Sequence, residues 1–214
     1  MTSTPHTPTP HTTTPDITAP STTASETTKP SSHERYETLA RRFDAVIDTT
    51  APSAWTNPSP CEGWSAADVV AHVVDSEREF LRRAGVPLEE RPEVAADPVA
   101  GWRRHHDELS GLLADPAVAD AAYTGMFGDT TVGAMLADFY GFDLIVHRND
   151  IARAVGVADT FEEEELTMVE RAADGFGDHL YGDGVCAAAV EVPRDASRQD
   201  RLLGRLGRDP RWRP

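Results

Sequence analysis

Apolar residues recur every three or four positions along most of the chain, which is the period of an amphipathic α-helix. The pattern predicts a first helix over 33–48, where Ser31 and Glu34 in front of it match a capping box. A second helix is predicted over about 66–84, and Gly85 ends it. The inner faces that we expect for these two helices consist of Tyr36, Leu39, Phe43 and Ile47 and of Val69, Val73, Ser76 and Phe80.

A third helix is predicted to begin with Asp97 as its cap and Pro98 in its first turn. We expect its inner face to consist of Val99, Trp102, His106, Leu109 and Leu113. A fourth helix is predicted from Thr130 or Thr131 to about Val155. Because this segment is apolar nearly all round, it should be the central helix of the fold.

The part of the chain after the fourth helix is less regular. A fifth helix is predicted from a capping box at Thr160 and Glu163 to about Tyr181. A short helix is expected from Arg198 to Leu206. Together, the five long segments and this short one predict an all-α fold, in which a four-helix bundle carries a short, partly irregular C-terminal appendage.

Composition divides the chain of 214 residues into three regions. Residues 1–32 are rich in Thr, Pro and Ser and bury too little apolar surface to fold, so we predict a disordered tail. Residues 33–181 form the predicted helical bundle. Residues 182–214 are the predicted appendage packed on that bundle.

The chain is strongly acidic, with a formal net charge of −16. This charge argues against nucleic acid and anionic membranes as partners, and no apolar run is long enough to span a membrane. No secretory signal is apparent, and the two cysteines, Cys61 and Cys186, match no disulfide framework, so we expect a cytoplasmic protein. A homodimer is left open.

The clearest candidate chemistry lies on the fourth predicted helix. Asp143 and His147 are four residues apart and therefore share one face, and His72 on the second helix can join them if the two helices pack. Two imidazoles and one carboxylate make a metal site with open positions for water or substrate. A hydrogen-bonded network without metal explains the same spacing, and the spacing alone favours that explanation.

Other polar residues have several interpretations. Arg153 is expected to neutralise Asp150, one turn earlier, and Asp68 either orients His72 or caps its helix. His105, His106 and His179 are rival ligands without a partner at the right spacing. Cys61 precedes a helix and could be a nucleophilic thiol, although a small buried side chain is the simpler interpretation.

Three segments resemble one known family. The run Pro60-Cys61-Glu62-Gly63-Trp64-Ser65 followed by Asp68, His72 and Val73, the segment from Asp143 to Ala154, and the ending Asp200 to Pro210 are similar to the metal-binding domain of mycothiol-dependent maleylpyruvate isomerase, a DinB-like four-helix bundle. The ending resembles an actinobacterial branch known mainly for metal binding. The resemblance covers about residues 35–212.

The resemblance implies a three-ligand site for one divalent metal, usually taken as zinc, held by His72, Asp143 and His147. Asp143 stands where the isomerase has a glutamate, so the carboxylate is one methylene shorter. The implied activity is that of a transferase or isomerase in which a metal-activated thiolate of mycothiol reacts with a small electrophilic substrate. Two alternatives stay open: a non-catalytic metal-binding stress or regulatory module, and an iron(II) site that uses oxygen.

Overall fold

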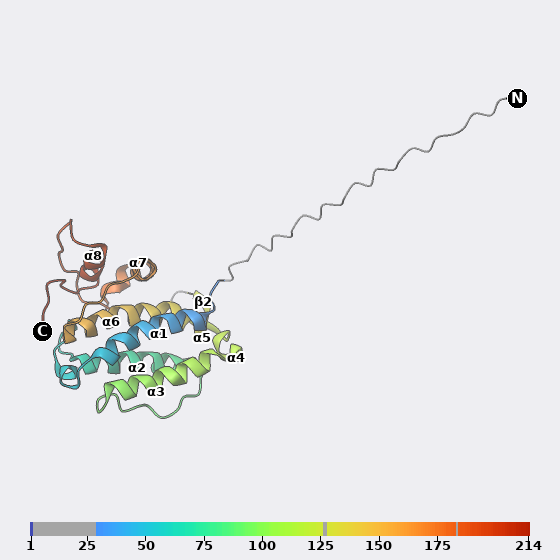
Figure 1. Cartoon of the computed structure of the whole chain (residues 1–214), viewed down its shortest axis with the longest axis horizontal. Helices are drawn as coiled ribbons and strands as arrows, with labels where there is room; N and C mark the ends of the chain where they lie inside the picture. The colour runs from blue at the N-terminus through green and yellow to red at the C-terminus, as the bar shows by residue number, and fades with distance from the viewer. Residues whose placement is uncertain (2–28, 126–127, 183) are drawn as a thin grey trace.

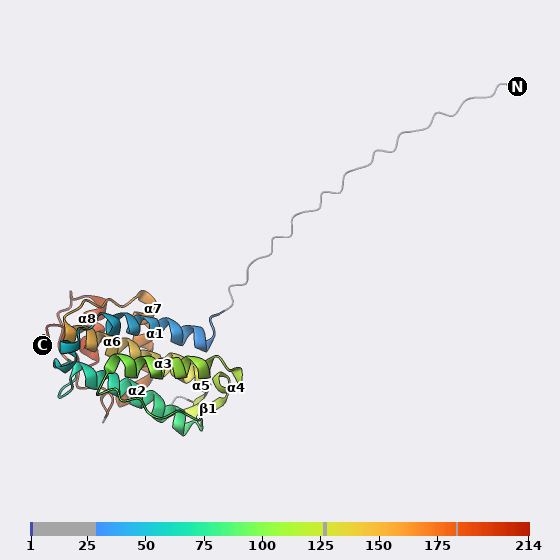
Figure 2. The same ribbon diagram turned by 60° about the horizontal axis from the view of Figure 1, so that its bottom comes forward.

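The computed structural model of the chain describes Met1 and residues 29–125, 128–182 and 184–214. Four long helices run side by side along most of its length (Figures 1 and 2). They are α1 (Ser32–Thr49), α2 (Ala66–Arg83), α3 (Pro98–Leu113) and α6 (Gly141–Val155). The predicted all-α fold class is therefore confirmed, and within the described residues no helix is long and apolar enough to cross a membrane.

The helix α6 is the centre of the bundle. It packs against α1 on one side and α2 on the other, while α3 closes the bundle by packing on both α1 and α2. Every residue from Leu144 to Ala152 is buried. This agrees with the sequence, in which the segment is apolar nearly all round.

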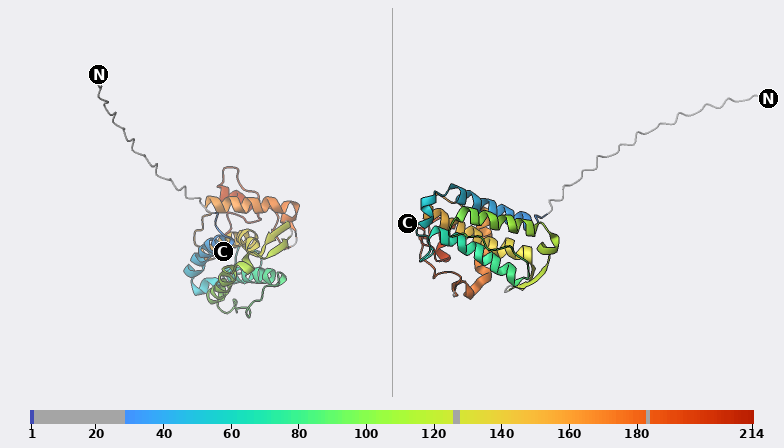
Figure 3. Two further views of the ribbon diagram at one scale, coloured as in Figure 1. Left: turned by 90° about the vertical axis from the view of Figure 1, so that its right-hand side faces the viewer. Right: turned by 90° about the horizontal axis from the view of Figure 1, so that it is seen from below.

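Shorter elements connect or cover the bundle. They are η1 (Pro52–Thr56), α4 (Pro116–Ala119), β1 (Ala122–Gly125), β2 (Gly128–Thr131), α5 (Val132–Met135), η2 (Leu136–Tyr140), α7 (Glu163–Phe176), η3 (Gly177–Tyr181) and α8 (Arg198–Arg205). The helix α7 packs on α6 from outside the bundle, and α8 packs on α7 (Figure 3). The C-terminus lies at the end of the bundle where α1 leads into η1 (Figure 1).

Most helix ends follow the predicted local signals. Ser31 and Glu34 form the reciprocal capping box of α1, and the Asp97 side chain caps α3. Gly85 and Gly156, with φ angles of 78° and 77°, adopt the left-handed conformation that ends α2 and α6. The short helix α8 is likewise followed by Gly207 at a φ of 78°.

The predicted fourth helix is not uniform. Thr131 caps it as expected, but the five residues of η2 form a π-helical turn between α5 and α6. The hairpin of β1 and β2 in front of it was not predicted; it pairs Ala122 with Thr131 and Thr124 with Asp129. A π-turn widens the helix locally and is frequent beside functional sites, and this one directly precedes the turn that carries Asp143.

Three predictions about helix caps, ends and faces are wrong in detail. The cap of α7 is Glu162, whose backbone N–H binds the Glu165 carboxylate at 2.9 Å, and Thr160 lies two residues further upstream. The α-helical part of α7 ends at Phe176 because Gly177 has a φ of 52°, and the rest up to Tyr181 is a 3₁₀ turn. On α3 the fully buried histidine is His105, and His106 lies at the edge.

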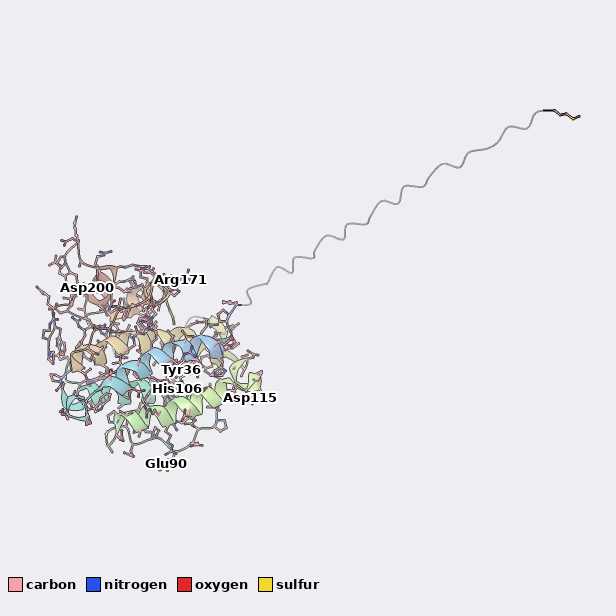
Figure 4. All side chains as sticks on the ribbon, viewed as in Figure 1. Tyr36, Glu90, His106, Asp115, Arg171 and Asp200 are labelled. Atoms are coloured by element: carbon pink, nitrogen blue, oxygen red, sulfur yellow. The ribbon has the colours of Figure 1, made fainter. Side chains whose placement is uncertain are left out.

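A polar network fills the space that α1, α2 and α3 enclose. Glu77 accepts hydrogen bonds from the Tyr36 hydroxyl at 3.0 Å and pairs with His105 Nε2 at 2.8 Å, with all three side chains buried. His106 lies next to Tyr36, as Figure 4 shows, and contacts Asp44 and Glu37. These hydrogen bonds offset the cost of burying the Glu77 carboxylate and link α1, α2 and α3, while His105 Nδ1 has no hydrogen-bond partner among the described residues.

Candidate metal centre

The helix α2 lines one side of a cavity. His72, Ser76, Glu79 and Arg83 all border this cavity, at spacings of four, three and four residues. This spacing places the four side chains along a single face of α2. His72 lies nearest the start of the helix and is about one-third exposed.

Asp143 and His147 reach the same cavity from the first half of α6. His72 Nε2 lies 3.6 Å from Asp143 Oδ2, and His147 Nε2 lies 3.3 Å from Asp143 Oδ1. The two imidazole rings are 4.9 Å apart between centroids. One donor atom from each side chain lies within 4.8 Å of the other two, so the packing of α2 on α6 brings the three predicted ligands together.

The charges of the three side chains are coupled. Burial alone would raise the pKa of Asp143, but the imidazoles of His147 and His72 hold that pKa well below its usual range. Burial alone would lower the pKa of His147, but Asp143 and Asp150 raise it well above its usual value. A positive charge beside Asp143 is therefore strongly favoured, whether a proton on His147 or a metal ion supplies it.

A second layer of side chains lies behind His147. Its Nδ1 atom pairs with Asp150 Oδ2 at 3.0 Å, and the Cys61 thiol donates to the same oxygen at 3.2 Å. Arg208 donates to that oxygen at 3.0 Å. When a carboxylate accepts the Nδ1–H of a histidine, the Nε2 lone pair is free for a metal ion, so Asp150 orients His147 for the cavity side.

Arg208, not Arg153, neutralises Asp150. The prediction from sequence placed Arg153 in this role because it follows one turn later on the same helix. In the structure the Arg153 guanidinium binds the backbone carbonyls of Asp209 and Pro210 instead. The fully buried Asp150 side chain faces Cys61 and Arg208. Burial alone would raise the pKa of Asp150, but the positive charge of Arg208 helps to hold this pKa well below its usual range.

The rival candidates lie elsewhere. Asp68 is the second half of the capping box with Ser65, so its role is to begin α2 and not to orient His72. His105 and His106 belong to the network among α1, α2 and α3. His179 is exposed on η3. Among the described residues, the other group of possible ligands shares His147 and consists of Cys61, His147 and Asp150.

The cavity beside the triad has a volume of about 950 Å³. The π-turn and α6 form one wall and α2 another, and the coil after η3 closes it together with Arg208. The Trp64 indole lies over His72, with ring centroids 4.8 Å apart. The three candidate ligands therefore face a space large enough for a small molecule.

Sequence reasoning missed two residues of this site. Trp64 was considered only as part of the family-like run from Pro60 to Ser65, yet it is 36% exposed and packs against His72. Arg208 was considered only as part of the segment Asp200 to Pro210 that resembles the family. In the structure it lies beside Asp150 and both cysteine sulfurs. No local pattern could reveal Arg208, because 58 residues separate it from Asp150.

The residues present fit a divalent ion. The donor set combines two imidazole nitrogens with a carboxylate, Asp150 orients His147 from behind, and the cavity leaves room for further ligands. The shorter aspartate side chain reaches far enough, since its oxygens approach both imidazoles within 3.6 Å. Imidazole and carboxylate donors suit zinc, and they suit other divalent metals as well.

The fold and the site define a class: DinB-like helical bundles with a candidate metal centre between two neighbouring helices. The chain belongs to the mycothiol maleylpyruvate isomerase N-terminal domain family, whose sequence model matches residues 36–152. The resemblance seen in the sequence is thus confirmed, and this family is a metal-binding one. The matched range contains all three candidate ligands and ends before Arg208.

Two curated relatives cover nearly the whole chain. They are the uncharacterized protein Rv0738 of Mycobacterium tuberculosis (strain ATCC 25618 / H37Rv) and the uncharacterized protein MT0763 of Mycobacterium tuberculosis (strain CDC 1551 / Oshkosh). Each is 28% identical to this chain over 188 residues, which are 84% of this chain and 97% of the relative. No solved structure matches the chain.

Asp150→Asn should weaken metal binding without abolishing it. The amide is nearly isosteric, but it carries no charge to hold the Nδ1–H of His147 and leaves Arg208 without its partner. Loss of such an outer partner typically lowers metal affinity about 10–100-fold. Competition with a chromogenic chelator measures the affinity. Asp138→Asn, on an exposed carboxylate paired with Arg35, is the matched control, and equal affinity in both variants would contradict the role of Asp150.

Proposed function

We propose that this chain binds one divalent metal ion, zinc in the first instance, through His72, Asp143 and His147 and catalyses a transferase or isomerase reaction of a low-molecular-weight thiol. Mycothiol, the thiol in the name of the family, is the proposed co-substrate. The observation that carries the proposal is the convergence of three donor side chains at a cavity of about 950 Å³. A closed site made only of protein atoms would instead suit a non-catalytic module.

The charge of the donor set supports a thiol as the co-substrate. Two neutral imidazoles and one carboxylate leave a divalent ion with one net positive charge, which an anionic ligand can neutralise. When bound, the ion lowers the pKa of a coordinating thiol so that the thiolate is present at neutral pH. Asp143 limits this charge by supplying the single negative side chain of the triad.

The side chains of the protein have separate roles in this proposal. Asp150 and Arg208 fix the orientation of His147, so that its Nε2 stays turned to the cavity. Trp64 packs against the ring of His72 and limits its movement. The cavity walls hold the electrophile close to the thiol, which lowers the entropic part of the barrier.

The bonds that change follow from the chemistry of thiols. In an addition, the thiol sulfur forms a bond to one carbon of an activated double bond, and the thiol proton goes to the other carbon. In a displacement, the sulfur–carbon bond forms as the leaving group departs, and the proton leaves with that group. In an isomerisation, addition, rotation about the carbon–carbon bond and elimination return the thiol unchanged.

The proposal also concerns partners and location. A chain with a net charge of −16 repels nucleic acid and anionic lipid, so we propose small molecules as its ligands. A small-molecule thiol must stay reduced to react, which favours the cytoplasm as the place of action.

The deciding experiment combines metal analysis with a thiol assay. The purified protein should contain close to one equivalent of divalent metal and should consume mycothiol in the presence of at least one member of a panel of electrophiles. The chelated, metal-free protein should be inactive and should recover activity with zinc. Absence of stoichiometric metal would overturn the metal site. Bound metal without thiol consumption across the panel would overturn the catalytic part and favour the metal-binding module.

A further inference from the structure

The exposed apolar side chains of the bundle and appendage gather at one place. Apart from Met1, three large apolar residues are exposed in the part of the chain that the structure describes: Trp64, Tyr181 and Val185, at 36%, 47% and 40%. All three line the cavity of the candidate metal centre. Contiguous exposed apolar surface is uncommon on soluble domains and marks sites where another molecule binds.

Hydrogen bonds and ring contacts hold these exposed rings in place. Trp64 packs against His72, and its backbone N–H donates to the Cys61 carbonyl at 3.0 Å. The Tyr181 hydroxyl donates to the Arg205 carbonyl at 3.1 Å, which fixes the ring from α8. Ordered aromatic side chains lose little conformational entropy when a ligand covers them, so this rim is prepared for binding.

The apolar surface continues into the cavity. Phe139, Phe142 and Phe176 line its wall, with ring centroids 5.6 Å apart for Phe139 and Phe176 and 6.0 Å apart for Phe142 and Phe176. Phe142 directly precedes Asp143 on α6, so this wall lies beside the triad. A flat apolar molecule could therefore keep contact with aromatic rings from the mouth of the cavity to the triad.

The charged residues of the cavity do not favour a ligand with several negative charges. Among the described residues that line it, the arginines are Arg83 and Arg208. Arg208 is bound to Asp150, and Arg83 lies 3.8 Å from Glu79. Glu62 adds a further negative charge. A small dicarboxylate would meet an Arg208 that is already bound to Asp150 and the carboxylates of Glu62 and Glu79, whereas an uncharged ring would meet aromatic walls.

We propose that the rim of Trp64, Tyr181 and Val185 binds the aromatic part of the electrophilic co-substrate, with its reactive carbon directed at the triad. The substrate class is uncharged aromatic electrophiles, not small polyanions. This inference rests on the proposed function for the reaction of the electrophilic carbon. Binding of the aromatic part can be measured without any reaction.

The test measures binding of ligands in the absence of any thiol. Isothermal titration calorimetry compares 2-naphthylmethanol, an inert uncharged aromatic compound, with maleate, a small dianion, on the zinc-loaded protein and on the chelated, metal-free protein, because maleate can also bind the zinc ion itself. We expect naphthylmethanol to bind and maleate to bind at least about tenfold more weakly. Because the titration contains no thiol, neither compound is consumed during the measurement, and the result does not depend on whether the protein catalyses a thiol reaction.

Variants of the rim locate the binding site. Trp64→Ala and Tyr181→Ser should each weaken binding of naphthylmethanol about tenfold, the typical size of a lost aromatic contact at a binding site. Val185→Ser, on an exposed coil residue, should weaken it less and keeps the test valid if either aromatic variant is unstable. Trp212→Ala removes a partly exposed tryptophan outside the cavity and should bind like the wild type.

Three outcomes would overturn the inference. Tighter binding of maleate would show that the cavity selects anions. Equal binding by wild type and all rim variants would place the aromatic ligand elsewhere. Loss of a dimer in the rim variants, measured by light scattering, together with no change in ligand binding, would show that the rim is an interface between two copies of the chain.

Discussion

Replacing His147 by alanine should abolish stoichiometric metal binding. His147 is 5% exposed, lies between Asp143 and Asp150 and is the only candidate ligand, among the described residues, that both these carboxylates contact. Its removal deletes one of three donors and the group through which Asp150 acts. Loss of a hydrogen-bond partner of a ligand, such as Asp150, typically lowers metal affinity about 10–100-fold, and loss of His147 itself should lower it further. Metal content after dialysis against a weak chelator measures it.

Two further variants make this result specific. His179→Ala removes an exposed histidine and should retain one equivalent of metal. Asp143→Asn keeps the shape of the side chain, removes its charge and should lose metal as His147→Ala does. Far-ultraviolet circular dichroism establishes that each variant is helical. Full metal content in folded His147→Ala would remove this residue from the site.

The pH dependence of metal affinity is a second test of the role of His147, because protons compete with the metal for this side chain. Because Asp143 and Asp150 raise the pKa of His147, a proton occupies the site near neutral pH and metal must displace it. The affinity of the wild type for metal should thus increase as the pH rises from about 6 to about 9. His147→Ala should lose most of this pH dependence along with its affinity.

Arg148→Ala should be among the most destabilising substitutions in the chain. Arg148 forms two parallel hydrogen bonds to Glu165, at 2.5 and 3.0 Å, and one to Asp159 at 2.9 Å. All three side chains are at most 7% exposed. Truncation leaves the buried Asp159 carboxylate without a cation and leaves Glu165 with Arg42 alone, at 3.3 Å. Breaking a buried pair in this way typically costs about 3–5 kcal/mol. Urea titration followed by circular dichroism measures the free energy of unfolding.

The matched control is another arginine that pairs with an acid on α7. Arg205 lies 2.7 Å from Asp174, but both side chains are more than one-third exposed. Exposed pairs contribute at most about 1 kcal/mol, so Arg205→Ala should unfold nearly as the wild type does. A similar loss of unfolding free energy in both variants would mean that burial does not explain the contribution of Arg148 to stability.

Local signals predicted the helices well. Ser31 with Glu34, Asp97 with Pro98, and Gly156 each act over one turn of chain, and the structure places helix ends at all three. The hairpin before α5 was missed because each strand has only four residues, too few for a clear alternating pattern. The π-turn was missed because it keeps the apolar composition of the helix around it.

The candidate site was predictable only in part. Asp143 and His147 share a helix face by spacing alone, whereas His72 joins them only if the second and fourth predicted helices pack, and the family resemblance favoured its role as a ligand. The structure brings His72 to the other two by packing α2 against α6. The role of the three side chains as metal ligands stays a prediction, and metal analysis of the His147 variant is its direct test.

By itself the sequence determined the helical segments, most of their caps and the pairing of Asp143 with His147, because these depend on residues within one or two turns of each other. The tertiary structure alone decided which charge neutralises Asp150, which histidine of α3 is buried, and which apolar side chains stay at the mouth of the cavity. Arg208 replaces Arg153 beside Asp150 because the choice of partner depends on how the C-terminal segment packs against the bundle. That packing joins residues 58 positions apart, and no local periodicity encodes it.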